Sequence, residues 1–245
     1  MSGIADGTGN RTEAPSLANP DPRSSSSRSS RRRIGLFGGT FDPIHVAHLA
    51  LDDWARAELA LDEVRLIPTG RSWQKEAAGA SAADRLRMAE LATADRPWLL
   101  VDDRETRRPG STYTVDTLAE LRAEFGSEPA LVWLLGSDQL HNLPTWDRYE
   151  QLLSFAHLAV TQRERVSLHG FPPAVEALLA RHGAQTLPDT PSGSIVFFRM
   201  PALPVSGTVL RRRLAAGERP GELVPGPVLD YIDQAGLYRR GPGQR

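Results

Sequence analysis

The chain has 245 residues, and 40% of them are hydrophobic, which suits one globular domain with a core that needs no covalent cross-links. It contains no cysteine, so a disulfide framework, a thiolate nucleophile and a cysteine-ligated metal are all excluded. No apolar run approaches the roughly 20 residues that cross a bilayer, and the start lacks the apolar core of a secretory signal. We therefore expect a cytoplasmic protein with no membrane partner.

The formal net charge of -1 hides an asymmetry along the chain. Residues 1–33 carry six arginines and three acidic residues, whereas the rest carries 23 basic and 27 acidic residues. The body is therefore not a basic platform, and nucleic acid is not an expected partner. Lys75 is the only lysine in the chain, so arginine must supply the positive charge wherever else a ligand needs one.

The first 33 residues lack periodic hydrophobicity, and the stretch from Ser24 to Arg33 is nearly all serine and arginine. Such a segment buries too little surface to offset its ordering entropy, so we expect a disordered extension over 1–33 and one domain over 34–245. Its composition also resembles a transit peptide, although three acidic residues and weak amphipathicity argue against that. A dispensable extension is the favoured interpretation; targeting and weak nucleic-acid contact are the alternatives.

Short apolar runs and amphipathic stretches alternate through the body. The apolar runs predict strands at 34–37, 64–67, 98–101, 131–135, 158–161 and 195–198. Helical patterns occupy 45–60, 81–94, 114–125, 173–182, 207–216 and 227–235. In the first of them Leu49, Ala50, Trp54 and Ala57 recur at helical spacing, and Ser81 is the expected N-cap of the second.

This alternation predicts an α/β fold, Rossmann-like and doubly wound, with a mainly parallel sheet and helices on both faces. Ligands of such sheets bind beyond the carboxyl ends of the strands, where the strand order reverses. The loops after the first and fourth strands are therefore the places to search for a site.

Residues 38–48, Gly-Gly-Thr-Phe-Asp-Pro-Ile-His-Val-Ala-His, follow the first strand and open the first helix. Gly38 and Gly39 have no Cβ, so the backbone can come close to a phosphate, and the helix start offers unpaired N–H groups. His45 and His48 are three positions apart and project from one helical face. Paired imidazoles there can donate hydrogen bonds to phosphate oxygens as negative charge develops.

Other interpretations of this loop are open. The glycines do not have the G-x-G-x-x-G spacing of a dinucleotide site, and no P-loop lysine follows. A glycine pair after a strand is often only a turn. Two histidines at this spacing are also found as a packing pair or as half of a zinc site, which would need a third ligand.

The loop resembles the G-x-F-D-P-x-H-x-G-H signature of the nucleotidyltransferase superfamily, and residues 34–240 resemble bacterial nicotinate-nucleotide adenylyltransferases. The resemblance implies that His45 and His48 are catalytic and that the loop binds ATP through Gly38, Gly39, Thr40 and Phe41. Ala47 stands where the family has glycine. Its extra methyl group lies where adenine or ribose would approach, but it removes no catalytic group.

A second strand-to-helix corner lies at 205–211, Val-Ser-Gly-Thr-Val-Leu-Arg. Ser206 or Thr208 can cap the helix that starts there. The run matches the family pattern I-S-x-T-x-I-R, which implies that Arg211 grips the ATP phosphates, with Ser206 and Thr208 beside it. Arg212 and Arg213 point elsewhere, because successive helix positions are about 100° apart. The lysine-rich loop of the class I aminoacyl-tRNA synthetases is absent.

The second substrate is assigned largely by the same resemblance. Trp146 offers a flat face for a pyridine ring, and a half-buried aromatic without a ligand is the alternative. In the family, the residue at Thr114 and the backbone N–H at Asp147 bind the nicotinate carboxylate, although an acidic Asp147 beside a carboxylate is unfavourable. Asp138 matches a position near the ribose, with a helix cap as the alternative. Arg163 matches a position at the nucleotide site.

Lys75 lies in a loop where many relatives carry a proline pair and a histidine, and either a triphosphate contact or a solvated role is open for it. The expected reaction joins the adenylyl group of ATP to nicotinate mononucleotide by direct in-line attack, giving deamido-NAD and pyrophosphate. Mg²⁺ is expected as a cofactor held mainly by ATP phosphates. The alternatives are nicotinamide mononucleotide or another phosphate acceptor, or a non-catalytic nucleotide sensor or RNA-contacting protein. A homo-oligomer is compatible with the sequence.

Overall fold

The structure is a computed structural model, and it describes residues 31–72, 79–163, 170–201 and 203–239. The expected disordered extension lies outside these ranges except for its last three residues. Residues Arg31–Arg245 form one compact unit, and its first strand already begins at Arg33. The guanidinium of Arg33 donates to the carbonyl oxygens of Leu59 and Leu187, which fixes the start of the strand against two loops.

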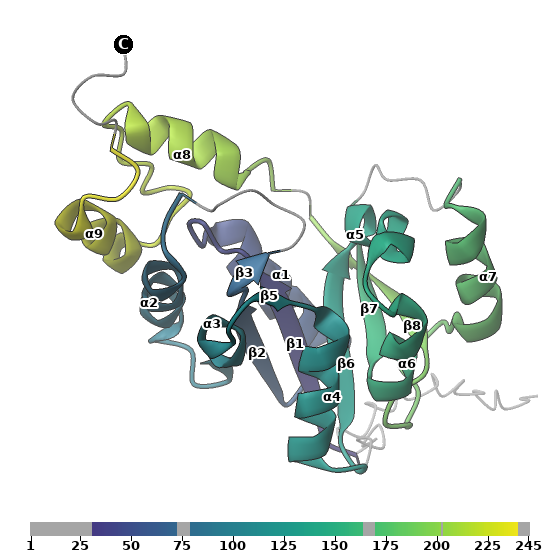
Figure 1. The fold of residues 1–245 in the computed structure, drawn as a ribbon. Helices are drawn as coiled ribbons and strands as arrows, with labels where there is room; N and C mark the ends of the chain where they lie inside the picture. The colour runs from purple at the N-terminus through teal and green to yellow at the C-terminus, as the bar shows by residue number, and fades with distance from the viewer. Residues whose placement is uncertain (1–30, 73–78, 164–169, 202, 240–245) are drawn as a thin grey trace, which may run out of the picture. The chain divides into compact units, whose positions relative to one another are not determined.

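Six parallel strands form the main sheet, in the order β4-β2-β1-β6-β7-β8 (Figure 1). Their bounds are β1 Arg33–Gly39, β2 Glu63–Pro68, β4 Leu99–Val101, β6 Ala130–Gly136, β7 His157–Arg163 and β8 Ile195–Met200. The chain builds outward from β1 to β4, returns to β6 on the other side of β1, and builds outward again. The order therefore reverses between β1 and β6, which are the first and fourth predicted strands.

Helices join the strands and cover both faces of this sheet. The longer ones are α1 Val46–Glu58, α2 Ala82–Thr93, α4 Thr114–Phe125, α7 Pro173–His182, α8 Gly207–Ala215 and α9 Gly226–Ala235. The shorter elements are β3 Arg71–Ser72, α3 Arg104–Arg107, β5 Ser111–Thr112, α5 Ser137–His141, η1 Leu143–Thr145, η2 Tyr149–Gln151 and α6 Leu152–Phe155, with β3 and β5 paired in a small second sheet. The predicted Rossmann-like α/β fold is confirmed.

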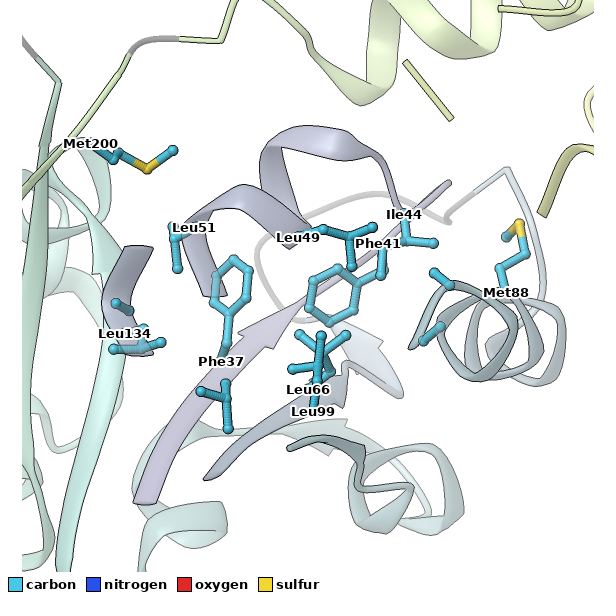
Figure 2. Packing of buried hydrophobic residues seen from close by; sticks show 14 of the residues in the cluster. Phe37, Phe41, Ile44, Leu49, Leu51, Leu66, Met88, Leu99, Leu134 and Met200 are labelled. Atoms are coloured by element: carbon cyan, nitrogen blue, oxygen red, sulfur yellow. The ribbon is translucent and has the colours of Figure 1, made fainter. Parts of the chain in front are cut away.

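Each face of the sheet has its own hydrophobic cluster, because side chains of a strand alternate between the two faces. On one face Phe37 of β1 belongs to a cluster with residues of α1, α2 and α9. Figure 2 shows part of this cluster, including Leu49 and Leu51 of α1 and Met88 of α2. On the other, Ile34 and Leu36 of the same strand pack with α4 and the segment from α5 to α7. The sheet is therefore buried on both sides, and a ligand must reach it at the strand ends. No helix in the described ranges is long and apolar enough to span a membrane.

The sequence predicted helix α1 correctly, but it did not predict which side of the helix is buried. Leu49, Asp52 and Ala55 face the core, whereas Trp54 is 41% exposed. Asp52 is fully buried, and neither carboxylate oxygen has a hydrogen-bond partner among the residues that the structure describes. Burial, and then the charge of neighbouring Asp53, raise the pKa of the Asp52 carboxyl well above its usual range.

Replacing Asp52 with asparagine should stabilise the protein at pH 7. The folded chain keeps a proton on Asp52 that the unfolded chain releases above about pH 4, so this residue makes stability fall as pH rises. We expect Asp52→Asn to raise the free energy of unfolding by about 1–3 kcal/mol at pH 7 and by less at pH 4. Urea unfolding at both pH values measures this. Asp95→Asn, at an exposed position, is the control, and a loss of stability at both pH values would contradict the prediction.

Candidate active site

A cavity of about 950 Å³ opens at the carboxyl ends of β1 and β6, where the strand order reverses. It brings together most of the residues that the sequence singled out, from both strand-to-helix corners and from the expected pyridine side. These are Gly38, Gly39, Thr40, Phe41, His45, His48, Thr114, Trp146, Asp147, Ser206, Thr208 and Arg211. Segments as far apart in the chain as 38–48 and 206–211 therefore face one shared space.

The three remaining expected site residues are Asp138, Arg163 and Lys75. Asp138 lies on α5 and is exposed, and the cavity is lined instead by its neighbours Gly136 and Gln139. Arg163 is the last residue of β7. Lys75 lies outside the described residues. The helix-cap alternative for Asp138 also fails, since α5 begins at Ser137 with no side-chain cap.

The two glycines of the first loop make room for the protein's own aromatic rings. A Cβ on Gly38 would lie 2.6 Å from the ring of Trp133, and a Cβ on Gly39 would lie 2.9 Å from the ring of Phe41. From the sequence, we explained Gly38 and Gly39 by a close approach of the backbone to phosphate. The structure shows that side chains at these positions would first meet the rings of Trp133 and Phe41. Phe41 itself has a φ of 49° and is 2% exposed, so the turn places a strained backbone over a buried ring.

The two imidazoles of the loop lie face to face, with ring centroids 3.7 Å apart and planes 15° apart. The backbone N–H of His45 donates to Nδ1 of His48 at 3.2 Å, which places the proton of a neutral His48 ring on Nε2. Phe41 packs edge-on against His48, with a centroid distance of 5.0 Å. Burial lowers the pKa of His45 to about 4, so its ring is neutral at pH 7.

The second corner meets the first through Arg211. Ser206 caps α8 by accepting from the N–H of Val209 at 3.4 Å, as the sequence predicted. One turn into the helix, Nη1 of Arg211 donates to the main-chain oxygen of Asp42 at 2.7 Å. A Cβ on Gly207 would lie 3.1 Å from this same Nη1, so the glycine allows the guanidinium to approach the loop. Arg213 instead pairs with Glu218 and Glu222, as expected of a surface charge.

Two residues that sequence analysis did not assign hold the loops of the cavity in place. The carboxylate of Asp42 is buried and accepts from the backbone N–H groups of Gly79 at 2.7 Å and Ala80 at 3.1 Å. Arg85 of α2 is buried, and it donates to the carbonyl oxygens of Thr40 at 2.8 Å and Gly70 at 2.9 Å. Both interactions join segments distant in sequence, so no local pattern announces them.

Trp146 and Asp147, which were expected beside the pyridine ring, also line the cavity. Trp146 is half-buried, and its indole N–H finds no acceptor in the described part of the chain. The side chain of Asp147 is engaged by Arg148, whose Nε lies 2.8 Å from it while Nη2 reaches Asp116 at 2.6 Å. The negative charge of the Asp147 side chain, next to the backbone N–H of the same residue, is therefore paired with the guanidinium of Arg148.

Glu105 is a further lining residue that sequence analysis did not single out. Its carboxyl is 4% exposed and accepts from the hydroxyl of Thr117 at 2.7 Å. Burial raises the pKa of Glu105, although hydrogen bonds from threonine hydroxyls act in the opposite direction. Its backbone lies against Gly70, where a Cβ would be 2.1 Å from the Glu105 oxygen. Glu105 therefore joins α4 to the loop at Gly70 beside the cavity.

Comparison with known proteins identifies the family of this chain. The family model described as cytidylyltransferase-like matches residues 36–213, so the chain belongs to this class of nucleotidyltransferases. Relatives named probable nicotinate-nucleotide adenylyltransferase include one from Cellvibrio japonicus, 44% identical over 85% of this chain and 100% of the relative. Another, from Chromobacterium violaceum, is 46% identical over 84% of this chain and 99% of the relative. The chain is a member of the nicotinate-nucleotide adenylyltransferase family.

Solved structures share the fold at low sequence identity. The nicotinic acid mononucleotide adenylyltransferase of Plasmodium falciparum complexed with NaAD superposes with a TM-score of 0.64 at 19% identity. The match covers 85% of this chain and 98% of that one. A nicotinate-nucleotide adenylyltransferase structure from Vibrio parahaemolyticus gives a TM-score of 0.56 at 14% identity, over 86% of this chain and 97% of that one. At these identities the agreement concerns the fold alone.

The depressed pKa of His45 predicts a pH dependence of stability. His45 takes up a proton near pH 6.5 in the unfolded chain but only near pH 4 in the folded chain. The contribution of neutral His45 to the free energy of unfolding is therefore complete above pH 6.5 and is lost as the pH falls toward 4. Between pH 7 and pH 4.5, His45→Asn should lose about 2–3 kcal/mol less unfolding free energy than the wild type. Denaturant unfolding at both pH values checks this. The exposed His141→Asn is the control, and identical slopes in wild type and His45→Asn would refute the assignment.

Proposed function

We propose that the protein transfers the adenylyl group of ATP to nicotinate mononucleotide, giving deamido-NAD and pyrophosphate, in the cytoplasmic synthesis of NAD. The observation that carries this proposal is the convergence of two corners on one cavity. The stacked histidines, Arg211, Trp146 and Thr114 at the N-terminus of α4 all line it. The curated relatives, which this chain matches along nearly their full length, support the same activity.

The polyphosphate half stabilises charge by placing donors in advance. The 5′-phosphate of the mononucleotide attacks the α-phosphorus of ATP in line, a P–O bond forms there, and the bond to the leaving pyrophosphate breaks. His48 presents Nε2–H to the cavity because its Nδ1 already accepts from the loop. The imidazole N–H groups then donate hydrogen bonds to the α-phosphate, and the guanidinium of Arg211 offsets the negative charge of the pyrophosphate, without reorganising.

The mononucleotide half reads a ring and a carboxylate. The indole of Trp146 stacks on the pyridine, while the hydroxyl of Thr114 and the backbone N–H of Asp147 donate to the nicotinate carboxylate. An acidic residue at 147 would repel that carboxylate, but Arg148 pairs with the Asp147 side chain and removes much of the repulsion. We assign no ribose contact to Asp138, because its side chain is exposed and lies outside the cavity lining.

A protein-built metal cage does not fit this cavity. The described residues contain no group of three or more histidine, cysteine or acidic side chains that could hold an ion. Of the acidic groups in the lining, Asp42 accepts two backbone N–H groups, Glu105 accepts from Thr117 and Asp147 pairs with Arg148. We therefore propose that Mg²⁺ would arrive bound to the ATP phosphates, with water as its other ligands.

A panel of acceptors tests the reaction. With ATP and Mg²⁺, pyrophosphate release should be fastest with nicotinate mononucleotide, and kcat/KM should fall at least about tenfold with nicotinamide mononucleotide, which lacks the charged acceptor of two hydrogen bonds. Phosphopantetheine should give no release above background. Release with none of the three acceptors, together with measurable ATP binding, would replace this proposal with a non-catalytic nucleotide sensor.

His48 gives a prediction about the chemical step. Removing its imidazole takes away a donor that acts chiefly in the transition state, so His48→Ala should lower kcat more than about a hundredfold. KM for nicotinate mononucleotide should change little, because that substrate contacts the other half of the cavity. Steady-state kinetics measure both, with circular dichroism to verify the fold. A fully active variant would remove His48 from the mechanism.

A further inference from the structure

The carboxylate of Asp42 is the most heavily bonded group at the phosphate end of the cavity. Its side chain is 4% exposed, and all of its donors come from other segments of the chain. Oδ2 accepts from the N–H of Gly79 at 2.7 Å and lies 3.5 Å from Nη1 of Arg211. Oδ1 accepts from the N–H of Ala80 at 3.1 Å and from the hydroxyl of Tyr238 at 2.6 Å.

Of the donors to Asp42, Tyr238 has no role in the proposed reaction. It lies just beyond α9, in a turn where its φ is 62°, and its ring packs over Gly79. A Cβ on Gly79 would be 3.1 Å from the Tyr238 ring and 3.1 Å from Cδ of Arg211, so this glycine lies between the two side chains. Burial, and then the hydrogen bond to Asp42, raise the pKa of the Tyr238 phenol, which keeps its proton.

Arg211 has two competing partners in this arrangement. The carboxylate of Asp42 attracts its guanidinium, and in the proposed function the ATP phosphates must attract it as well. At 3.5 Å the contact with Oδ2 is longer than a charge-assisted hydrogen bond, whereas the bond to the neutral main-chain oxygen of Asp42 is 2.7 Å. The carboxylate therefore orients Arg211 without pairing closely with it.

We propose that Tyr238 is a positioning residue for Arg211, which it controls by holding the carboxylate of Asp42 away from a close ion pair. The hydroxyl of Tyr238 donates to Oδ1 of Asp42 and holds the carboxylate toward the turn after α9. Without that hydroxyl, Oδ1 keeps only the N–H of Ala80 as a donor, and the buried carboxylate shortens its 3.5 Å separation from the charged guanidinium of Arg211. Arg211 is then less available to a polyphosphate. This inference rests on the proposed role of Arg211.

The chain offers a matched control for the test. Tyr231 of α9 donates its hydroxyl to Asp84 at 2.8 Å, the same type of bond, but neither residue lines the cavity. Tyr238→Phe and Tyr231→Phe each remove one hydroxyl and keep the ring. Both should lower Tm by a few degrees, Tyr238→Phe by the larger shift because its acceptor Asp42 is buried, and both variants should be folded at the temperature of the titration. A difference in ligand binding between them then reports position and not stability.

Isothermal titration with pyrophosphate and Mg²⁺ is the first measurement, because it does not require turnover. We expect Tyr238→Phe to weaken pyrophosphate binding at least about fivefold and Tyr231→Phe less than about twofold. In kinetics, Tyr238→Phe should raise KM for ATP by a similar factor and leave KM for nicotinate mononucleotide within about twofold. Equal behaviour of the two variants, or an equal rise of both KM values, would overturn the proposal.

A double-mutant cycle separates action through Arg211 from independent action. In an Arg211→Ala background, adding Tyr238→Phe should change pyrophosphate binding less than about twofold, since the residue it positions is gone. Multiplication of the two single effects would contradict the proposal even if Tyr238→Phe alone binds weakly. An inactive wild type that binds pyrophosphate and keeps these differences would refute the proposed reaction while supporting the role of Tyr238.

Discussion

A buried negative charge organises the phosphate end of this molecule. Removing a carboxylate from water is costly unless several donors surround it, so the side chain of Asp42 draws the start of α2 toward the first loop. The backbone oxygen of the same residue receives Arg211 from the far end of the chain. One residue therefore sets the distance between the two corners, and the histidine pair begins three positions later. A change in that distance would separate the imidazoles from the guanidinium.

The sequence predicted the sheet well because buried parallel strands have a strong local signature. The runs at 34–37 and 131–135 were recognisable as strands, and the rule of order reversal placed the site between them. The buried side of α1 could not be predicted in the same way. The apolar spacing includes Trp54, which is exposed, and leaves out Asp52, which the structure buries. The pair β3–β5 was missed because two-residue strands carry no periodicity. Hydrophobic pattern thus located layers better than it located faces.

For the site, local motifs and distant contacts differ in how far they could be predicted. His45, His48 and Arg211 belong to recognisable strings, and they do line one cavity. The stacking of the imidazoles, and hence the neutral state of His45, depends on burial that no spacing reveals. An acidic residue at 147 was unfavourable beside a nicotinate carboxylate when only the sequence was considered. The structure shows that the Asp147 side chain is paired with Arg148, which no sequence pattern predicted. Asp42 stood inside the predicted loop, but its donors lie far away in sequence.

The hydrogen bond between Tyr238 and Asp42 joins residues 196 positions apart. Closing so long a stretch of chain is entropically costly, and it is offset only once the intervening strands and helices have packed. A partly folded molecule with β1, β2 and β6 in place would hold the histidine loop but lack the groups that complete its charge balance. Such a partly folded molecule would lack the complete site, so substrate would bind only to the fully folded chain. By mass action, a nucleotide that binds only this finished fold would stabilise the whole domain against unfolding.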